Sequence, residues 1–107
     1  MNRPRNAWLA FEPKRFMDYR LSRQASARID EIIRYTDENF GPLQTLEYID
    51  GLYYSFDLLT DNPRLGRNWR DGKRRYIYRS HVVYYRIMDD HLFITEIRHG
   101  RQHAPDE

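Results

Sequence analysis

The sequence of 107 residues contains no cysteine. A disulfide framework and a thiolate metal site are therefore excluded, and the composition is compatible with a reducing cytoplasm. No apolar run approaches the length of a membrane-spanning helix. The apolar stretch at residues 7–11 is also too short for the core of a signal peptide. We therefore expect a soluble, cytoplasmic protein.

Lysine is scarce, because sixteen of the eighteen basic residues are arginine. The planar guanidinium suits phosphates and carboxylates, although the codon usage of a GC-rich genome would explain the count equally well. Residues 17–63 hold four basic and nine acidic residues, a net charge of −5, whereas residues 64–101 hold ten basic and four acidic residues, a net charge of +6. This separation predicts one acidic and one basic face.

The hydrophobic content of 40% and the aromatic content of 15% are sufficient for one globular domain. Residues 1–16 show no clean hydrophobic period, and we expect them to form an N-terminal extension that is mobile or loosely docked. The functional domain is expected to cover residues 17–102, followed by a tail at residues 103–107.

Residues 18–21 alternate between polar and apolar side chains, which predicts a short strand. Ser22 is a good N-cap for a helix over residues 23–39. Gly41 then ends this helix and Pro42 opens a second helix over residues 43–61, so that the two form an antiparallel hairpin. The predicted apolar stripes contain Ala25, Ile29, Ile32, Ile33 and Phe40 in the first helix, and Leu46, Ile49, Leu52, Tyr53, Phe56 and Leu59 in the second.

A loop at residues 63–72 precedes three runs that are rich in tyrosine, valine and isoleucine, at residues 73–80, 81–88 and 91–98. Tight polar turns between the runs predict an antiparallel meander. The middle run alternates, with Val83, Tyr85 and Ile87 on one face and Val82, Tyr84 and Arg86 on the other, whereas the last run alternates poorly and its core face stays unassigned. The predicted fold is α+β, with the order β-α-α-β-β-β: an N-terminal strand, a two-helix hairpin and a three-stranded meander.

Motifs for catalysis or metal binding are missing. The chain has no glycine-rich phosphate loop, no His-Glu-x-x-His and no EF-hand pattern. His99 and His103 are four residues apart but lack a neighbouring carboxylate motif, so we expect no metal site and no cofactor. His81 and His91 lie at strand starts, where most histidines are ordinary surface residues.

His99 is the one histidine with a candidate catalytic role. RNA cleavage needs a general acid that titrates near neutrality beside cations that hold the phosphate, and His99 with Arg79 and Arg86 would supply that set. The alternative is that His99 lies past the last strand and forms a hydrogen bond with the backbone at the end of the sheet. We favour this alternative, because one histidine among arginines is a weak signal.

Arginines and tyrosines in the last third of the chain indicate a partner with negative charge. Phosphate pairing and aromatic stacking suit a nucleic acid, whereas a basic groove with aromatic walls suits an acidic, amphipathic peptide. Because tyrosine is common in strands, most of the tyrosines in the first two runs are expected to be packing residues. These tyrosines are Tyr76, Tyr78, Tyr84 and Tyr85.

Three segments together resemble ParE-type toxins of the RelE/ParE superfamily, over roughly residues 18–102. The opening strand and helix are matched by Tyr19-Arg20-Leu21-Ser22, Ala25, Asp30, Ile33, Tyr35 and Gly41. The end of the second helix and its loop are matched by Tyr53, Phe56, Leu59 and Asn62-Pro63-Arg64-Leu65-Gly66-Arg67. The closing sheet is matched by Arg75, His81-Val82-Val83-Tyr84-Tyr85-Arg86 and Ile97-Arg98-His99-Gly100-Arg101-Gln102.

This resemblance implies the toxin of a type II toxin–antitoxin pair, which inhibits DNA gyrase and so blocks replication. It also implies a cognate ParD-like antitoxin whose disordered C-terminal segment folds across the toxin. Such a toxin is an inhibitor without catalytic residues, contacts nucleic acid only indirectly and does not contact a membrane. The residues expected to contact gyrase or the antitoxin are Arg64, Arg67, Arg75, Arg79, Arg86, Arg98, His99, Arg101 and Gln102.

Two alternatives remain open from the sequence. RelE-like relatives cut mRNA on the ribosome, usually with a strand rich in lysine and arginine and a tyrosine or histidine near the C-terminus. Here the strand region has the single lysine Lys73 and no tyrosine follows the last strand, which fits the ParE pattern better, while His99 keeps a nuclease open. The third possibility is a toxin-like scaffold that has lost activity and only binds its antitoxin.

Overall fold

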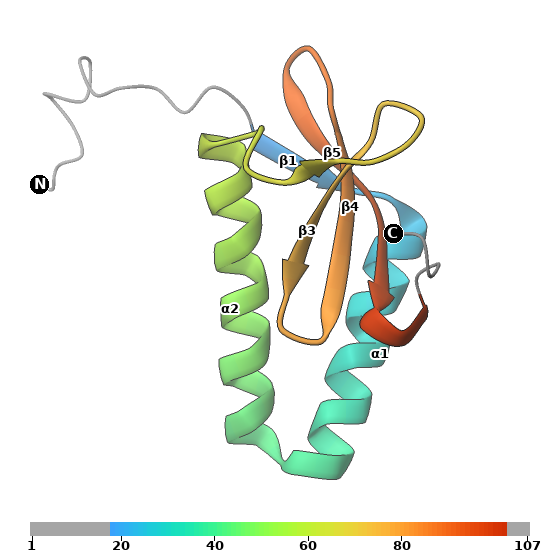
Figure 1. Ribbon diagram of the computed structural model, residues 1–107. Coiled ribbons are helices and arrows are strands. Elements are labelled where there is room, and N and C mark those ends of the chain that lie inside the picture. The colour runs from blue at the N-terminus through green and yellow to red at the C-terminus, as the bar shows by residue number, and fades with distance from the viewer. Residues whose placement is uncertain (1–17, 103–107) are drawn as a thin grey trace, which may run out of the picture.

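The computed structural model describes residues 18–102 as two helices packed on a five-stranded sheet (Figure 1). The elements are β1 (Asp18–Leu21), α1 (Arg23–Phe40), α2 (Pro42–Asp61), β2 (Arg67–Asn68), β3 (Arg74–Tyr78), β4 (His81–Ile87), β5 (His91–His99) and the 3₁₀ helix η2 (Gly100–Gln102). The predictions of an extension at residues 1–16 and a tail at residues 103–107 concern parts outside the described residues. The predicted α+β class and the order of the main elements are confirmed.

The sheet has the strand order β1-β5-β4-β3-β2. β1 pairs with β5 in parallel, and all other neighbours are antiparallel. The first and last strands of the described chain are therefore side by side. The helical hairpin follows β1, and the meander then ends with β5 beside it. The two-residue strand β2 was not predicted, since Arg67 and Asn68 lie in a loop whose sequence shows no alternation.

Side chains at the helix ends set the limits of the hairpin. The Oγ of Ser22 accepts a hydrogen bond from the backbone N–H of Ala25 at 3.0 Å and donates to the carbonyl of Thr95 at 2.7 Å, so the N-cap also attaches α1 to β5. Gly41 has a φ of 86°, in the region that favours glycine, and its N–H donates to the carbonyl of Asp37. The predicted helix bounds are confirmed to within one residue.

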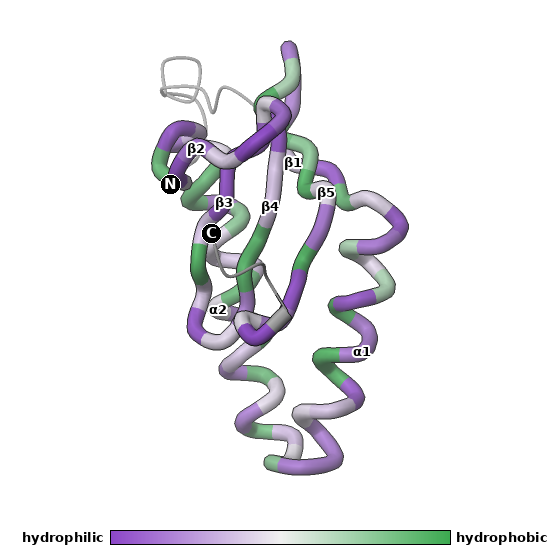
Figure 2. Tube along the Cα trace, turned by 45° about the vertical axis from the view of Figure 1, so that its right-hand side comes forward, coloured by the Kyte–Doolittle hydropathy of each residue, from purple (hydrophilic) through white to green (hydrophobic). Residues whose placement is uncertain are grey.

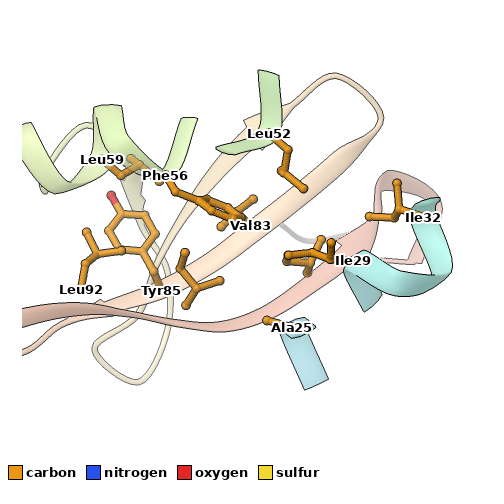
Figure 3. Packing of buried hydrophobic residues seen from close by; sticks show 11 residues of the cluster. Ala25, Ile29, Ile32, Leu52, Phe56, Leu59, Val83, Tyr85 and Leu92 are labelled. Atoms are coloured by element: carbon orange, nitrogen blue, oxygen red, sulfur yellow. The ribbon is translucent and has the colours of Figure 1, made fainter. Parts of the chain in front are cut away.

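The core lies between the helices and one face of the sheet. Figure 3 shows side chains from α1, α2, β4 and β5 meeting there. Burying each large apolar side chain stabilises the fold by about 1.5–3 kcal/mol. The buried cluster contains Ala25, Ile29, Ile32, Leu52, Phe56, Leu59, Val83, Tyr85, Leu92, Ile94 and Ile97.

The predicted apolar stripes are wrong at three positions. The exposed fractions of Ile33, Phe40 and Leu46 are 38%, 59% and 60%. Hydrophilic and hydrophobic residues alternate along α1 (Figure 2), and the hairpin extends past the end of the sheet (Figure 1), so no layer covers Phe40 and Leu46 near the connection between the helices. Ile33 is exposed for another reason, because the neighbouring Ile32 occupies the buried side of α1. None of the helices within residues 18–102 combines the length and apolar character required to cross a membrane.

A β-bulge explains the poor alternation of the last strand. The pairing with β4 shifts between Tyr84, which lies opposite Glu96, and Tyr85, which lies opposite Ile94. Thr95 is therefore the extra residue, and the side chains change phase at this point of β5. The alternation predicted for β4 is confirmed for Val83 and Tyr85, which lie in the core, whereas Ile87 at the end of the strand is 37% exposed.

Candidate partner-binding site

A groove with a volume of about 680 Å³ lies between the two helices and the end of the sheet formed by the β3–β4 turn. Its walls combine apolar and aromatic side chains from the hairpin with basic side chains from the sheet. The residues that line it are Arg28, Glu31, Ile32, Tyr35, Thr36, Phe40, Gln44, Tyr48, Arg79, Ser80, His81, His99 and Arg101.

The β3–β4 turn brings Arg79 to the groove. Arg79 has a φ of 51°, which is an uncommon conformation for a residue other than glycine. Its guanidinium carbon lies 5.7 Å from the ring centroids of both Tyr48 and Tyr78, within the range of a cation–π interaction. The backbone N–H of Gly100 donates to the carbonyl of Ser80 at 2.7 Å, which joins η2 to the same turn.

Tyr48 connects α2 to the sheet at the floor of the groove. Its Oη lies 2.7 Å from Nδ1 of His81 and 3.1 Å from the Oγ of Ser80. The hydroxyl of Tyr78 donates to the carbonyl of Tyr48 at 2.8 Å, and the two rings form an edge contact at 5.1 Å. The position of Tyr48 is therefore fixed through both its backbone and its hydroxyl.

His81 and His99 are direct partners on β4 and β5, with ring centroids 5.3 Å apart. The pKa of His81 is lowered to about 4. Burial is the main cause, and the positive charges of the nearby His99 and Arg28 contribute the remainder. The His81 imidazole is therefore uncharged at neutral pH. The interpretation of His81 as an ordinary surface residue is wrong, because its side chain is half-buried and bonded to Tyr48.

His99 is the last residue of β5, so the prediction that it lies past the last strand is wrong. Its Nδ1 accepts a hydrogen bond from the backbone N–H of Arg101 at 3.1 Å. The backbone hydrogen bond favoured for this histidine is therefore confirmed. His99 nevertheless lines the groove beside Arg79 and Arg101, so three of the nine predicted contact residues meet there.

Arg86 lies elsewhere. It is five residues from His81 along β4 and pairs with Phe93, which places it roughly 16 Å from the histidine end of the strand. The structure therefore brings His99 and Arg79 together but does not bring Arg86 to them. The trio considered for RNA cleavage is not assembled in this conformation.

Of the other predicted contact residues, Arg64, Arg67, Arg75 and Arg98 lie outside the groove. Arg67, Arg75 and Arg98 lie on the sheet face opposite the helices, as the register with neighbouring strands shows. Arg64 is exposed in the loop before β2, and its carbonyl accepts a hydrogen bond from Nη2 of Arg74 at 3.3 Å. Gln102 belongs to η2.

The tyrosines of β4 are packing residues, as expected. Tyr84 and Tyr85 are 2% and 0% exposed. The Tyr85 hydroxyl donates to the carbonyl of Pro63 at 2.6 Å and accepts from the N–H of Gly66 at 2.9 Å, and burial raises its pKa. Neither ring is available to stack on a base.

The sequence analysis did not identify the residues that form the aromatic wall of the groove. Tyr35, Phe40 and Tyr48 continue the helical apolar pattern, and only the end of the sheet leaves Tyr35 and Phe40 exposed by 62% and 59%. Within residues 18–102, no group of three or more histidine, cysteine, aspartate or glutamate side chains is arranged to hold a metal ion.

Comparison with known proteins gives one consistent family. Residues 19–104 match the family described as the ParE toxin of the type II toxin–antitoxin system parDE. Toxin ParE1 of Caulobacter vibrioides is 38% identical over 72 residues, which cover 64% of this chain and 75% of that protein. Toxin ParE1 of Mycobacterium tuberculosis is 35% identical over 87 residues, which cover 78% of this chain and 89% of that protein.

A solved structure of the chromosomal ParDE system from P. aeruginosa shares the fold, with a TM-score of 0.70 at 21% sequence identity. The similarity covers 80% of this chain and 98% of that one. The family match spans the helical hairpin, the groove and the whole meander. The chain therefore belongs to the ParE toxin family of type II toxin–antitoxin systems.

Proposed function

We propose that this protein inhibits DNA gyrase and that a ParD-like antitoxin neutralises it by occupying the groove beside the β3–β4 turn. The observation that carries the proposal is the ParE family match over residues 19–104. The resemblance to ParE-type toxins implies gyrase as the target, and inhibition of this kind requires a binding surface rather than a catalytic group.

The arrangement of basic residues supports an inhibitor over a ribosome-dependent nuclease. A nuclease built from His99, Arg79 and Arg86 needs all three near one phosphate, and Arg86 is at the other end of β4. His99 also uses its Nδ1 to accept a backbone hydrogen bond. A general acid at this position would therefore have to act through Nε2 without Arg86.

The groove has the chemistry that an acidic, amphipathic segment requires. Tyr35 and Phe40 offer exposed apolar surface, and Arg79 and Arg101 offer positive charge within the same cavity. A partner helix or strand with one apolar and one acidic face would satisfy both at once. Because such a segment orders on binding, the apolar contacts must offset that entropy loss.

The purified protein should be assayed in a gyrase supercoiling and DNA-cleavage reaction, in parallel with a coupled translation reaction. Lost supercoiling with accumulated cleaved DNA and undisturbed translation would support the proposal. Intact gyrase activity with cleaved mRNA would overturn it and make a nuclease the function. Activity in neither reaction would favour a scaffold that only binds its antitoxin, and gyrase from the native host should be used so that this outcome is decisive.

The antitoxin site has its own test. The antitoxin encoded beside this gene should be titrated against the wild type, Phe40→Asp and Arg79→Glu. Each substitution is expected to weaken binding at least tenfold, about 1.4 kcal/mol, because it places an acid against an acidic, apolar partner. Arg34→Glu is the matched control, since Arg34 is exposed on α1 outside the groove. Equal weakening by the control would contradict the assignment of the groove.

A further inference from the structure

Strand register places a series of arginines on the face of the sheet that the helices do not cover. Directly paired residues share a face, and Tyr84, Val82 and Arg86 alternate with the core residues of β4. The rows through these three positions are Arg67–Arg75–Tyr84–Glu96, Ile77–Val82–Arg98 and Arg86–Phe93–Arg20. We call the arginines of these rows, together with Arg70, the arginine face.

Trp69 organises one half of this face. The guanidinium carbons of Arg70 and Arg75 lie 4.4 and 4.7 Å from its ring centroid, and its ring contacts that of Tyr84 at 6.4 Å. Stacking on the indole holds the guanidinium groups in place before a ligand binds. Binding therefore costs these side chains less conformational entropy. The loop that carries Trp69 is closed just before β3, because the Trp69 N–H donates to the carbonyl of Lys73 at 2.8 Å.

Arg86 extends the face towards the same loop. Its Nη1 lies 3.0 Å from the position that a Cβ would occupy at Gly72, where the backbone has a φ of 76°. Only glycine allows the guanidinium to approach the turn this closely without strain. Arg67 is exposed beside Arg75, so the loop and the sheet edge present their charges together.

Within the three rows the acidic residue is Glu96, which pairs with Arg98 at 2.8 Å, and the other carboxylates near this face lie at its edges. These are Asp18 at the start of β1, Asp71 in the Trp69 loop, and Asp89 and Asp90 in the β4–β5 turn. The helix α2 contains four acidic residues and no lysine or arginine. The fold therefore has an electrostatic polarity that would direct the sheet, and not the helices, towards a polyanion.

We propose that the arginine face binds the phosphate backbone of nucleic acid directly. The composition of the exposed surface favours nucleic acid over a protein as the ligand. Protein interfaces have apolar, aromatic centres, whereas Ile77 is the large hydrophobic side chain that these rows leave exposed, and the remainder of their exposed surface is mainly arginine. Interfaces with nucleic acid are more polar and much more positive.

The aromatic residues here support the arginines instead of contacting bases. Tyr84 is 2% exposed, and the Trp69 ring is occupied by guanidinium groups. Binding is therefore expected to be independent of sequence and strongly dependent on salt. Direct contact goes beyond the sequence-based expectation that this toxin meets nucleic acid only indirectly, and it does not depend on the proposed gyrase target.

The size of the face sets the expected salt dependence. Five strands at about 4.8 Å spacing span roughly 19 Å, enough for about three or four phosphate contacts. The plot of log K against log salt concentration should then have a slope of about −3 for duplex DNA and about −2 to −3 for a single strand. Comparing the two probes also shows which form of the backbone the face prefers.

Binding of the full-length protein to labelled 20-mer DNA, duplex and single-stranded, should be measured by fluorescence anisotropy without gyrase. The exposed residues Arg20, Arg67 and Arg70 are suited to substitution by glutamine, since none of them belongs to the core. Each single variant should reduce the slope by about 0.7–0.9. The triple variant should lose at least about tenfold in affinity at fixed salt.

Arg23→Gln and Arg34→Gln on α1 are the matched controls, because they remove the same charge from an exposed position on a helix. The basic residues within residues 1–17 are identical in every variant, so the differences report on the arginine face. Controls that weaken binding as much as the face variants would overturn the proposal, as would an unchanged salt slope. Polyglutamate that binds as tightly as DNA and is equally sensitive to Arg67→Gln would also overturn it, in favour of an acidic protein ligand.

Discussion

The hydroxyl of Tyr48 in the middle of α2 lies 2.7 Å from Nδ1 of His81, the first residue of β4. The two side chains are 33 positions apart in sequence, and their rings form an edge contact at 5.7 Å. This contact joins the helical wall of the groove to its floor. A change in the charge of His81 therefore acts on the packing of α2 against the sheet.

Acidification is expected to destabilise the fold through His81. Its pKa is about 4 in the folded protein against an ordinary value of 6.5, so between these values the unfolded chain binds a proton that the folded protein excludes. The free energy that the neutral His81 contributes to folding is fully present above pH 6.5 and is lost as the pH falls towards 4. Because the side chain still reaches solvent, we expect a loss of only about 1–2 kcal/mol, measurable by urea unfolding at pH 7.0, 5.5 and 4.5.

Two histidine variants separate this effect from general acid denaturation. His81→Gln should flatten the profile between pH 6.5 and 4.5, since the titrating group is absent. His91→Gln should keep the wild-type fall, because His91 lies at the other end of the sheet beside Asp90. A profile of His81→Gln as steep as that of the wild type would show that His81 is not responsible.

Gly51→Ala is expected to destabilise the protein, although alanine is normally the better helix residue by about 1 kcal/mol. A Cβ at Gly51 would overlap the Oη of Tyr78 and lie 2.9 Å from its Cζ. Overpacking of this kind costs about 1–3 kcal/mol. Thermal and urea unfolding should therefore show a lower midpoint for Gly51→Ala, and combining it with Tyr78→Phe, which removes the overlapping hydroxyl, should cost less than the sum of the single substitutions. Strict additivity would argue against this steric origin.

Tyr85→Phe is expected to loosen the loop before β3. The buried hydroxyl satisfies the carbonyl of Pro63 and the N–H of Gly66, and its removal leaves both backbone groups without this partner. The expected cost is about 1–3 kcal/mol in the free energy of unfolding, with faster hydrogen exchange of the Gly66 amide. Tyr54→Phe is the control, since Tyr54 is 66% exposed on α2 and its substitution should cost almost nothing.

Local chemistry allowed much of the fold to be predicted from the sequence. Ser22, Gly41 and Pro42 mark helix ends by backbone and side-chain bonds that involve near neighbours, and α1 and α2 begin and end within one residue of the prediction. The strand β2 and the bulge at Thr95 escaped prediction, because each depends on a partner strand and not on its own pattern.

The site was less predictable, because it depends on where the sheet ends. Phe40 reads as a core residue by helical spacing, yet it is exposed beside the groove. Arg79 precedes β4 and Arg86 lies near its far end, so the extended strand keeps their side chains apart, a separation that the grouping of His99 with both arginines overlooked. His81 acquires its depressed pKa from burial under α2, which strand position alone does not indicate.

His99 gives the sharpest test of mechanism in cells. If the protein acts as an inhibitor, His99→Ala should reduce growth inhibition only partially, and Arg101→Gln should reduce it by a similar factor, because both line one contact surface. If His99 were a general acid, His99→Ala alone should abolish toxicity, a loss of about 100-fold or more. Inducible expression with colony counts measures the effect, and His91→Ala serves as the control for a histidine outside the groove. Circular dichroism and thermal unfolding of each purified variant show that the fold persists, so a complete loss confined to His99→Ala would reject the inhibitor mechanism in favour of catalysis.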